Sequence, residues 1–170
     1  MVTSSEISQV LSAHPGVSRA QAATVRHNGQ DVTIVVVELS EYLSGPILRN
    51  YVRQRLGEDI GMVGVLTVDD IPMANGSIDV EYLTSAIADG RCTLFEDPRD
   101  DVERRVAEIW SAQMNVGSVG ANDDFLELGG DSLSALGIIA AIETEFDRSL
   151  DVYEFMSASS VRRLADILRR

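Results

Sequence analysis

The chain has 170 residues, enough for one domain or two small ones, and its apolar fraction of 45% is ordinary for a folded protein and argues against disorder. Its formal net charge of -13 disfavours nucleic acids and anionic membranes as partners and favours basic protein surfaces. The one cysteine, Cys92, excludes an internal disulfide and a cysteine-rich metal site. All of the positive charge is arginine, because the sequence contains no lysine.

The first residues carry no sign of a targeting segment. Residues 1–12 lack both the basic start and the long apolar run of a secretory signal, and no stretch of the chain is long enough to span a bilayer. We therefore expect a cytoplasmic protein.

Residues 1–90 are predicted to form a small α+β domain in which helices pack on a three-stranded sheet. Asn28-Gly29 is a strong signal for a hairpin turn. The nearly continuous apolar run 33–37 suits a strand that is covered on both faces. The periods of the apolar residues indicate helices over 6–13, 47–56 and 80–88, and strands over 20–26, 31–39 and 64–68.

The polar stretch 91–99, punctuated by Gly and Pro on either side, is predicted to be a linker, and Cys92 is expected to be an unreactive thiol within it. Residues 100–170 are predicted to form an all-α four-helix bundle, close to the lower size limit for an independent core. Apolar residues at spacings of three and four indicate helices over 101–114 and 132–146, a short turn near 152–156, and a last helix that includes 161–168.

A serine is placed at the start of the second of these helices by the block Phe125 to Leu133, which reads FLELGGDSL. The only histidines, His14 and His27, are far from Ser132 in sequence, so no base is visible that could activate its hydroxyl. A presented hydroxyl without its own base indicates the substrate of another enzyme rather than a catalyst. The alternative is a helix cap, in which Asp131 or Ser132 satisfies a free backbone N–H after a glycine-shaped turn.

This block resembles the phosphopantetheine attachment motif of carrier proteins, above all the peptidyl carriers of nonribosomal peptide synthetases. The resemblance implies that a phosphopantetheinyl transferase moves a 4'-phosphopantetheine arm from coenzyme A to Ser132, and that the transferase supplies the magnesium and the base. Asp131 would help to present the serine, and with Leu133 it borders the attachment point. Phe125 and Leu126 would pack the loop on the bundle. The arm would then carry an acyl group as a thioester.

The serine helix has more apolar surface than a single core stripe requires. Leu133, Leu136 and Ile139 form a second apolar line, which is either a wide core face or a docking face for the domains that the carrier visits. In the docking interpretation, Leu128 and Met156 join Leu133 and Leu136. The implied partners are the transferase and the adenylation, condensation, ketoreductase or thioesterase domains of the same synthetase.

The first 85 residues or so resemble the mobile C-terminal subdomain of adenylation domains. The resemblance is carried by the order of short pieces along the chain: Glu6-Ile7, the run 11–17, Met62-Val63-Gly64, the run 68–72, and Asn75-Gly76-Ser77-Ile78-Asp79. In this family a lysine follows Asn-Gly and stabilises negative charge as a carboxylate attacks ATP. Ser77 occupies that place here, and a hydroxyl cannot replace a cation.

We therefore interpret residues 1–90 as a degenerate, catalytically inactive adenylation subdomain with a structural role, and the chain as a carrier rather than an enzyme. Subdomains of this kind occur, by resemblance, in depsipeptide synthetase modules in which a ketoreductase interrupts the adenylation domain. Two alternatives stay open: a split adenylation subdomain that completes an ATP-binding core in trans, and a pure scaffold. We expect no metal site, since the pairs Asp69-Asp70 and Asp123-Asp124 lack the spacing of a calcium loop and are expected to be solvated.

Overall fold

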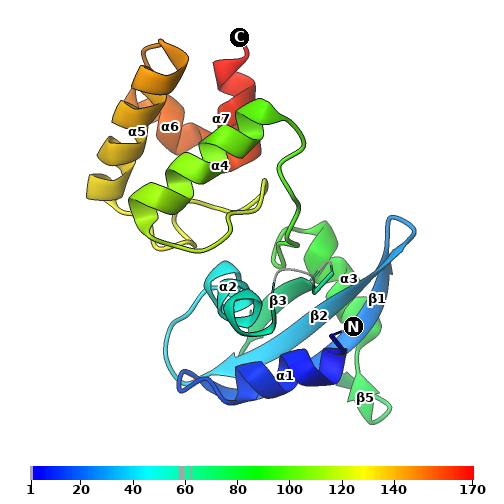
Figure 1. Ribbon diagram of the computed structural model, residues 1–170. Coiled ribbons are helices and arrows are strands. Elements are labelled where there is room, and N and C mark those ends of the chain that lie inside the picture. Colours follow the sequence, from blue (N-terminus) through cyan, green and yellow to red (C-terminus); the bar gives the residue numbers. More distant parts are fainter. Residues whose placement is uncertain (1, 58–59, 62) are drawn as a thin grey trace. The chain divides into compact units, whose positions relative to one another are not determined.

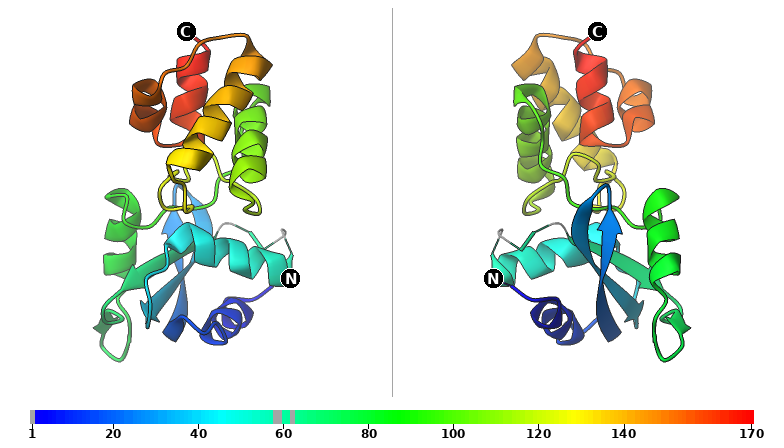
Figure 2. Two further views of the ribbon diagram at one scale, coloured as in Figure 1. Left: turned by 90° about the vertical axis from the view of Figure 1, so that its left-hand side faces the viewer. Right: turned by 90° about the vertical axis from the view of Figure 1, so that its right-hand side faces the viewer.

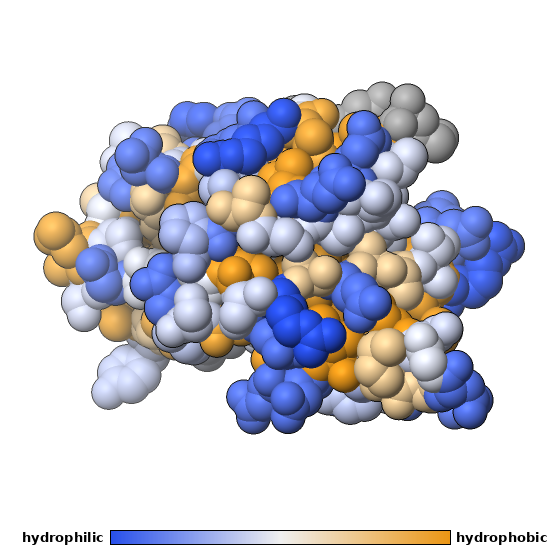
Figure 3. All heavy atoms as spheres, turned by 90° about the horizontal axis from the view of Figure 1, so that it is seen from below, coloured by the Kyte–Doolittle hydropathy of each residue, from blue (hydrophilic) through white to orange (hydrophobic). Residues whose placement is uncertain are grey.

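The computed structural model describes residues 2–57, 60–61 and 63–170, so Met1 and Met62, the first residue of one motif quoted above, lie outside the described residues. The chain divides into two compact units, one up to Leu94 and one from Phe95 to Arg170 (Figure 1). Within the described ranges, no helix is both long enough and apolar enough to cross a membrane. The face seen in Figure 3 has polar and apolar residues interspersed, as is usual for the surface of a folded protein.

The first unit is built on a three-stranded sheet with the order β1-β2-β3, in which β2 is antiparallel to β1 and parallel to β3. This confirms the predicted α+β class. Asn28 and Gly29 have φ values of 52° and 79°, the left-handed backbone that a tight hairpin turn needs between β1 and β2. The bounds of the elements in this unit are α1 Ser4–Ser12, β1 Val17–His27, β2 Gln30–Leu39, α2 Gly45–Leu56, β3 Val63–Val68, β4 Met73–Ala74, β5 Ser77–Ile78 and α3 Val80–Ala88.

The central strand β2 is buried on both faces, as its apolar run predicts. Val35 and Val37 pack in one core cluster with Leu11 of α1 and Leu48 of α2. Ile34 and its neighbours on the other face of the strand pack in a second cluster with α3. The two views of Figure 2 agree with this arrangement, with α1 and α2 on one face of the sheet and α3 on the other. Because side chains alternate along a strand, one strand supplies both cores.

Cys92 is not in a free linker, contrary to the prediction. It is 3% exposed and belongs to the core cluster that includes Ile34. A Cβ atom on Gly64 of β3 would lie 2.8 Å from the Cys92 Sγ atom, so the strand leaves room for the sulfur only because residue 64 is glycine. Burial raises the pKa of the Cys92 thiol to about 12, partly offset by the nearby Arg49 cation. The first residues of the expected linker therefore belong to the first unit: Cys92 packs in its core, and Leu94 pairs with Gly64 at the edge of its sheet.

The second unit is a helical bundle, as predicted, with α4 Asp101–Met114, α5 Ser132–Phe146, α6 Val152–Ala158 and α7 Val161–Leu168. Its core is centred on three aromatic rings in edge-to-face contact. The ring centroids of Trp110 and Phe125 are 5.8 Å apart, and those of Phe125 and Phe155 are 5.0 Å apart. Such pairs contribute about 0.5–1.5 kcal/mol each beyond the area they bury. They join the loop before α5 to α4 and α6.

Glu103 of α4 is a buried carboxylate that holds the two ends of the second unit together. Its side chain is 0% exposed and forms ion pairs with Arg99 at 2.8 Å, Arg162 at 3.2 Å and Arg169 at 3.5 Å. Burial alone would raise the pKa of Glu103, but its hydrogen bonds to Arg162 and to the Arg99 backbone, together with the charges of these arginines, lower the pKa below its ordinary value. The carboxylate therefore stays charged inside the bundle.

We predict that Glu103→Gln lowers the free energy of unfolding of the second unit by about 2 kcal/mol, because it removes the one negative charge that these arginines share. Because the folded pKa of Glu103 lies below its unfolded value of about 4.3, the ionic contribution is complete above that pH and disappears as the pH falls through the folded pKa. The loss in the variant should therefore shrink toward pH 3.

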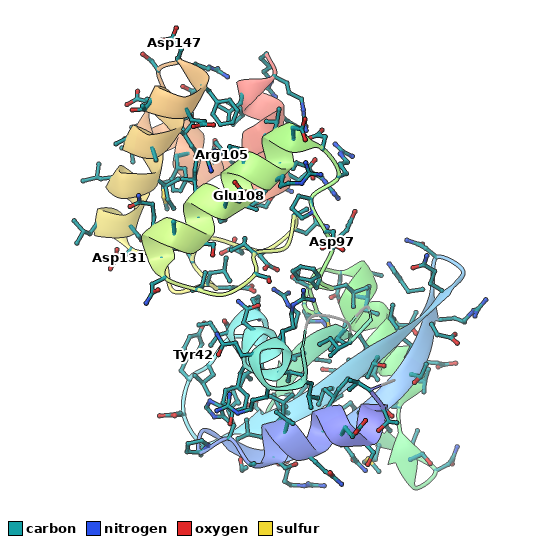
Figure 4. All side chains as sticks on the ribbon, in the orientation of Figure 1. Tyr42, Asp97, Arg105, Glu108, Asp131 and Asp147 are labelled. Atoms are coloured by element: carbon teal, nitrogen blue, oxygen red, sulfur yellow. The ribbon has the colours of Figure 1, made fainter. Side chains whose placement is uncertain are left out.

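The measurement is urea unfolding followed by the fluorescence of Trp110, the chain's one tryptophan. The matched control is Glu108→Gln, because Glu108 pairs with Arg105 on the exposed side of α4 (Figure 4). This variant should lower the free energy of unfolding by less than about 0.5 kcal/mol. Equal losses of unfolding free energy in the two variants would show that the burial of Glu103 adds nothing to the stability of the second unit.

Candidate functional site

Ser132 is the first residue of α5 and lies exposed at the end of a compact turn. Within that turn, Gly130 donates its N–H to the Phe125 carbonyl at 3.0 Å, and Gly129 donates to Leu126 at 3.0 Å. The Asp124 carboxylate accepts the N–H groups of Leu126 at 2.9 Å and of Glu127 at 3.1 Å. These bonds fix the path of the backbone into the helix and so fix the position of the serine.

Glycine is required in this turn for two different reasons. Gly129 has φ 89°, a backbone conformation that other residues rarely adopt. A Cβ atom on Gly130 would lie 2.4 Å from the ring of Phe125, which is buried in the aromatic core. The backbone two residues before Ser132 therefore lies directly on the core of the bundle, and no larger side chain fits there.

Asp131, not Ser132, caps the helix. Its Oδ1 atom accepts the N–H of Ser134 at 2.9 Å, and its own N–H is donated to the Ser134 Oγ atom at 2.9 Å, which forms a reciprocal capping box (Figure 4 labels Asp131). The hydrogen bonds from the Ser134 backbone N–H and hydroxyl lower the pKa of Asp131, so it is ionised at neutral pH. In the part of the chain that the structure describes, no hydrogen-bond partner is found for the Ser132 hydroxyl. That hydroxyl is therefore not needed for capping.

The residues fit a covalently attached phosphate ester. Ser132 presents a free hydroxyl at the N-terminus of a 15-residue helix, where the backbone dipole favours a negative group. Leu133 beside it is 80% exposed and obstructs no approach. Among the described residues, no group of three or more His, Cys, Asp or Glu side chains could hold a metal ion.

The four expected docking residues do not share one environment. Leu133, Leu136 and Met156 are 80%, 58% and 42% exposed. Leu128 is 3% exposed and belongs to the core of the bundle, so its assignment to a docking face is wrong. Its N–H donates to the Asp124 carbonyl at 3.1 Å within the turn.

Two further expectations need correction. Leu126, expected to pack the loop on the bundle, is 62% exposed, while Phe125 performs that role. Asp123, expected to be solvated, is 0% exposed and accepts the Gly120 N–H at 2.8 Å.

The second apolar line of α5, for which a core face and a docking face were both left open, divides between them. Ile139 is 7% exposed and lies in the core, whereas Leu133 and Leu136 are exposed.

The exposed apolar residues of α6 could not be recognised from the sequence. Val152 and Tyr153 are 50% and 89% exposed, and Met156 follows them by four and three residues, the spacings that place side chains on one side of a helix. Treating 152–156 as a turn concealed this spacing, because a turn has no helical face.

The comparisons with known proteins agree with this geometry. Residues 104–168 match the family model described as a phosphopantetheine attachment site. The chain is 37% identical over 124 residues to the isonitrile lipopeptide synthase of Mycobacterium tuberculosis, an alignment that covers 72% of this chain and 5% of that protein. It is 27% identical over 166 residues to gramicidin S synthase 2 of Brevibacillus brevis, covering 96% of this chain and 4% of the relative.

Among solved structures, the chain is similar to holo-AB3403, a four-domain nonribosomal peptide synthetase bound to AMP and glycine. The identity is 25% and the TM-score 0.46, over 96% of this chain and 12% of that one. The chain thus spans a small part of these two synthases. Its helical unit, built around a presented serine, belongs to the phosphopantetheine attachment-site family, and the chain as a whole is similar to nonribosomal peptide synthetases.

Proposed function

We propose that Ser132 is the residue that receives the phosphopantetheine arm, and that the second unit carries the acyl intermediates of a peptide synthetase on it. The observation that supports this best is the free hydroxyl of Ser132 beside a cap that Asp131 already provides. In the transfer, the Ser132 Oγ atom forms a bond to the phosphorus of the pantetheine phosphate of coenzyme A. The bond from that phosphorus to the bridging oxygen of the pyrophosphate breaks, and adenosine 3',5'-bisphosphate leaves.

Each residue at the site contributes to presentation rather than to catalysis. Asp131 holds the first turn of α5 closed without using the serine, and the transferase supplies the base that takes the serine proton. Gly129 and Gly130 allow the tight turn that brings the backbone against Phe125 just before the serine. Once attached, the arm ends in a thiol that carries the acyl group as a thioester. A tethered group of this kind gains effective concentration at each active site it reaches.

We predict that incubation with coenzyme A and a promiscuous phosphopantetheinyl transferase adds the mass of one phosphopantetheine group to the native chain and none to Ser132→Ala. Intact-mass spectrometry measures both. The matched control is Ser157→Ala, which removes an exposed hydroxyl on α6 of the same unit and should still gain the full mass. A native chain that stays unmodified, or a Ser132→Ala chain that gains the mass, would disprove the assignment.

The exposed leucines of α5 are proposed as docking residues for the transferase and for the domains of the synthetase. We predict that Leu133→Glu leaves the helical circular dichroism signal unchanged, since its side chain is 80% exposed, and changes the free energy of unfolding by less than about 0.5 kcal/mol. The same variant should lower kcat/KM for phosphopantetheinylation about tenfold or more, because a charge replaces an apolar contact.

The matched control for this variant is Thr144→Glu. It adds the same charge on the exposed side of the same helix, about 16 Å further along at 1.5 Å per residue. Loss of helicity in Leu133→Glu would instead assign Leu133 to the core, and equal loss of kcat/KM in both variants would assign the effect to net charge.

The first unit is proposed to be a degenerate adenylation subdomain that has lost the catalytic cation. Ser77, at the place of the family's lysine, lies in the two-residue strand β5 and is exposed, next to a turn at Asn75 and Gly76. A hydroxyl offers no positive charge to an adenylating transition state. The unit would then support or position the carrier, and its place after a ketoreductase in a depsipeptide synthetase module is part of the same proposal.

The alternative, a split subdomain that completes an ATP-binding core in trans, is tested with a separately expressed adenylation core. We expect the native chain to add nothing to the amino-acid-dependent ATP–pyrophosphate exchange of the core alone. Ser77→Lys is the matched comparison, because it restores only the cation. Stimulation by the native chain, or loading of its carrier by the core without pre-formed adenylate, would favour the alternative.

A further inference from the structure

The first unit has a broad open hollow on the side where the parallel strands β2 and β3 end. It has a volume of about 960 Å³ and is lined by residues that follow these strands and by residues of and after α3. Ser40, Tyr42 and Leu43 come from the segment after β2, and Asp69 and Asp70 from the segment after β3. None of these residues belongs to the carrier site around Ser132 or to the hairpin that contains Ser77.

The charge in this hollow is negative and unneutralised. Glu41, Asp69 and Asp70 are all exposed, and within the described ranges none of them forms an ion pair. The hollow's one lining cation, Arg91, is already engaged, since its Nε atom lies 2.9 Å from the Asp89 carboxylate and its Nη1 atom donates to the Tyr82 hydroxyl at 2.9 Å. A ligand would therefore meet carboxylates that lack a counter-charge.

The three carboxylates do not form a metal site. In the described part of the chain, no three acidic, His or Cys side chains come close enough to hold a metal ion. A ligand that satisfies Glu41 and the Asp69-Asp70 pair must therefore carry several positive charges spread along its length. It must also be partly apolar, because the half-buried side chains of Leu39 and Leu43 line the same hollow.

An aromatic ring completes the site. Tyr42 is 90% exposed, and Figure 4 shows it on the loop that joins β2 to α2. Exposing a ring of this size to water has no benefit for the fold of the first unit. Tyrosine is enriched where proteins bind one another, and its face attracts the cations of arginine and lysine.

We propose that this hollow binds a basic segment of a partner protein, in which arginine or lysine residues alternate with apolar ones. The cations would lie against Glu41, Asp69, Asp70 and the ring of Tyr42, and the apolar residues would cover the leucines. The openness of the hollow to solvent suits a peptide segment rather than an enclosed small molecule. This gives the first unit a binding role that is independent of Ser132 and of the missing lysine.

The test is an NMR titration of the ¹⁵N-labelled full chain with the capped peptide acetyl-Arg-Leu-Arg-Leu-Arg-Leu-amide. Chemical-shift changes should concentrate in residues 39–43 and 66–70, with saturation at one peptide per chain. The double variant Asp69→Asn with Asp70→Asn should raise the Kd about tenfold, because it removes two of the three free carboxylates. Tyr42→Ala should weaken binding without changing its dependence on salt, since it removes no charge.

The matched control is the double variant Asp97→Asn with Asp147→Asn. These aspartates are exposed, lie in the second unit and change the net charge by the same amount (Figure 4). Its Kd should equal that of the native chain. Absence of binding, shifts spread over both units, or equal weakening in the two double variants would each overturn the proposal. Because no step uses coenzyme A, its failure would leave the assignment of Ser132 untouched.

Discussion

The reciprocal bond between Asp131 and Ser134 is the interaction on which the carrier site depends. A helix N-terminus must satisfy its first free N–H groups, and the side chain of the N-cap residue ordinarily accepts one of them. Here the 2.9 Å bonds between Asp131 and Ser134 do this. Ser132 therefore keeps its hydroxyl at the positive end of the helix dipole, where a phosphate ester is electrostatically favoured. The presentation of the serine thus follows from the choice of the residues on either side of it.

The turn before the serine is held in place by its contacts with the core of the bundle. Phe125 packs between Trp110 and Phe155 in edge-to-face contacts, and its carbonyl accepts the N–H of Gly130. The loop is also bound at its other side, since Phe125 donates its N–H to the Ser159 carbonyl at 2.9 Å. A loop anchored on both sides fixes the position of Ser132 at the surface of the bundle. The buried Glu103 and its arginines contribute to the same end by holding α4 against α7.

Periodic elements and local turns could be predicted from the sequence, while contacts between distant residues could not. The hairpin at Asn28-Gly29, the doubly buried strand β2 and the bounds of α5 depend on neighbours a few residues away, and all three are confirmed. The errors at Leu126 and Leu128 arise in an irregular turn, where no period decides which side chain points inward. Cys92 was misplaced because its burial depends on the bridge between Leu94 and Gly64, about 30 residues apart in the sequence. The hollow after β2 and β3 likewise depends on two strands that only the fold brings together.

The fold of the first unit does not depend on Ser77. The two core clusters are formed by alternate residues of β2 with α1, α2 and α3. Ser77 is outside both clusters and is exposed in a short hairpin. The proposed loss of a catalytic cation at this place would therefore remove no core contact and would leave the unit folded. The carboxylates of the hollow and the exposed ring of Tyr42 are the part of its surface that folding alone does not explain.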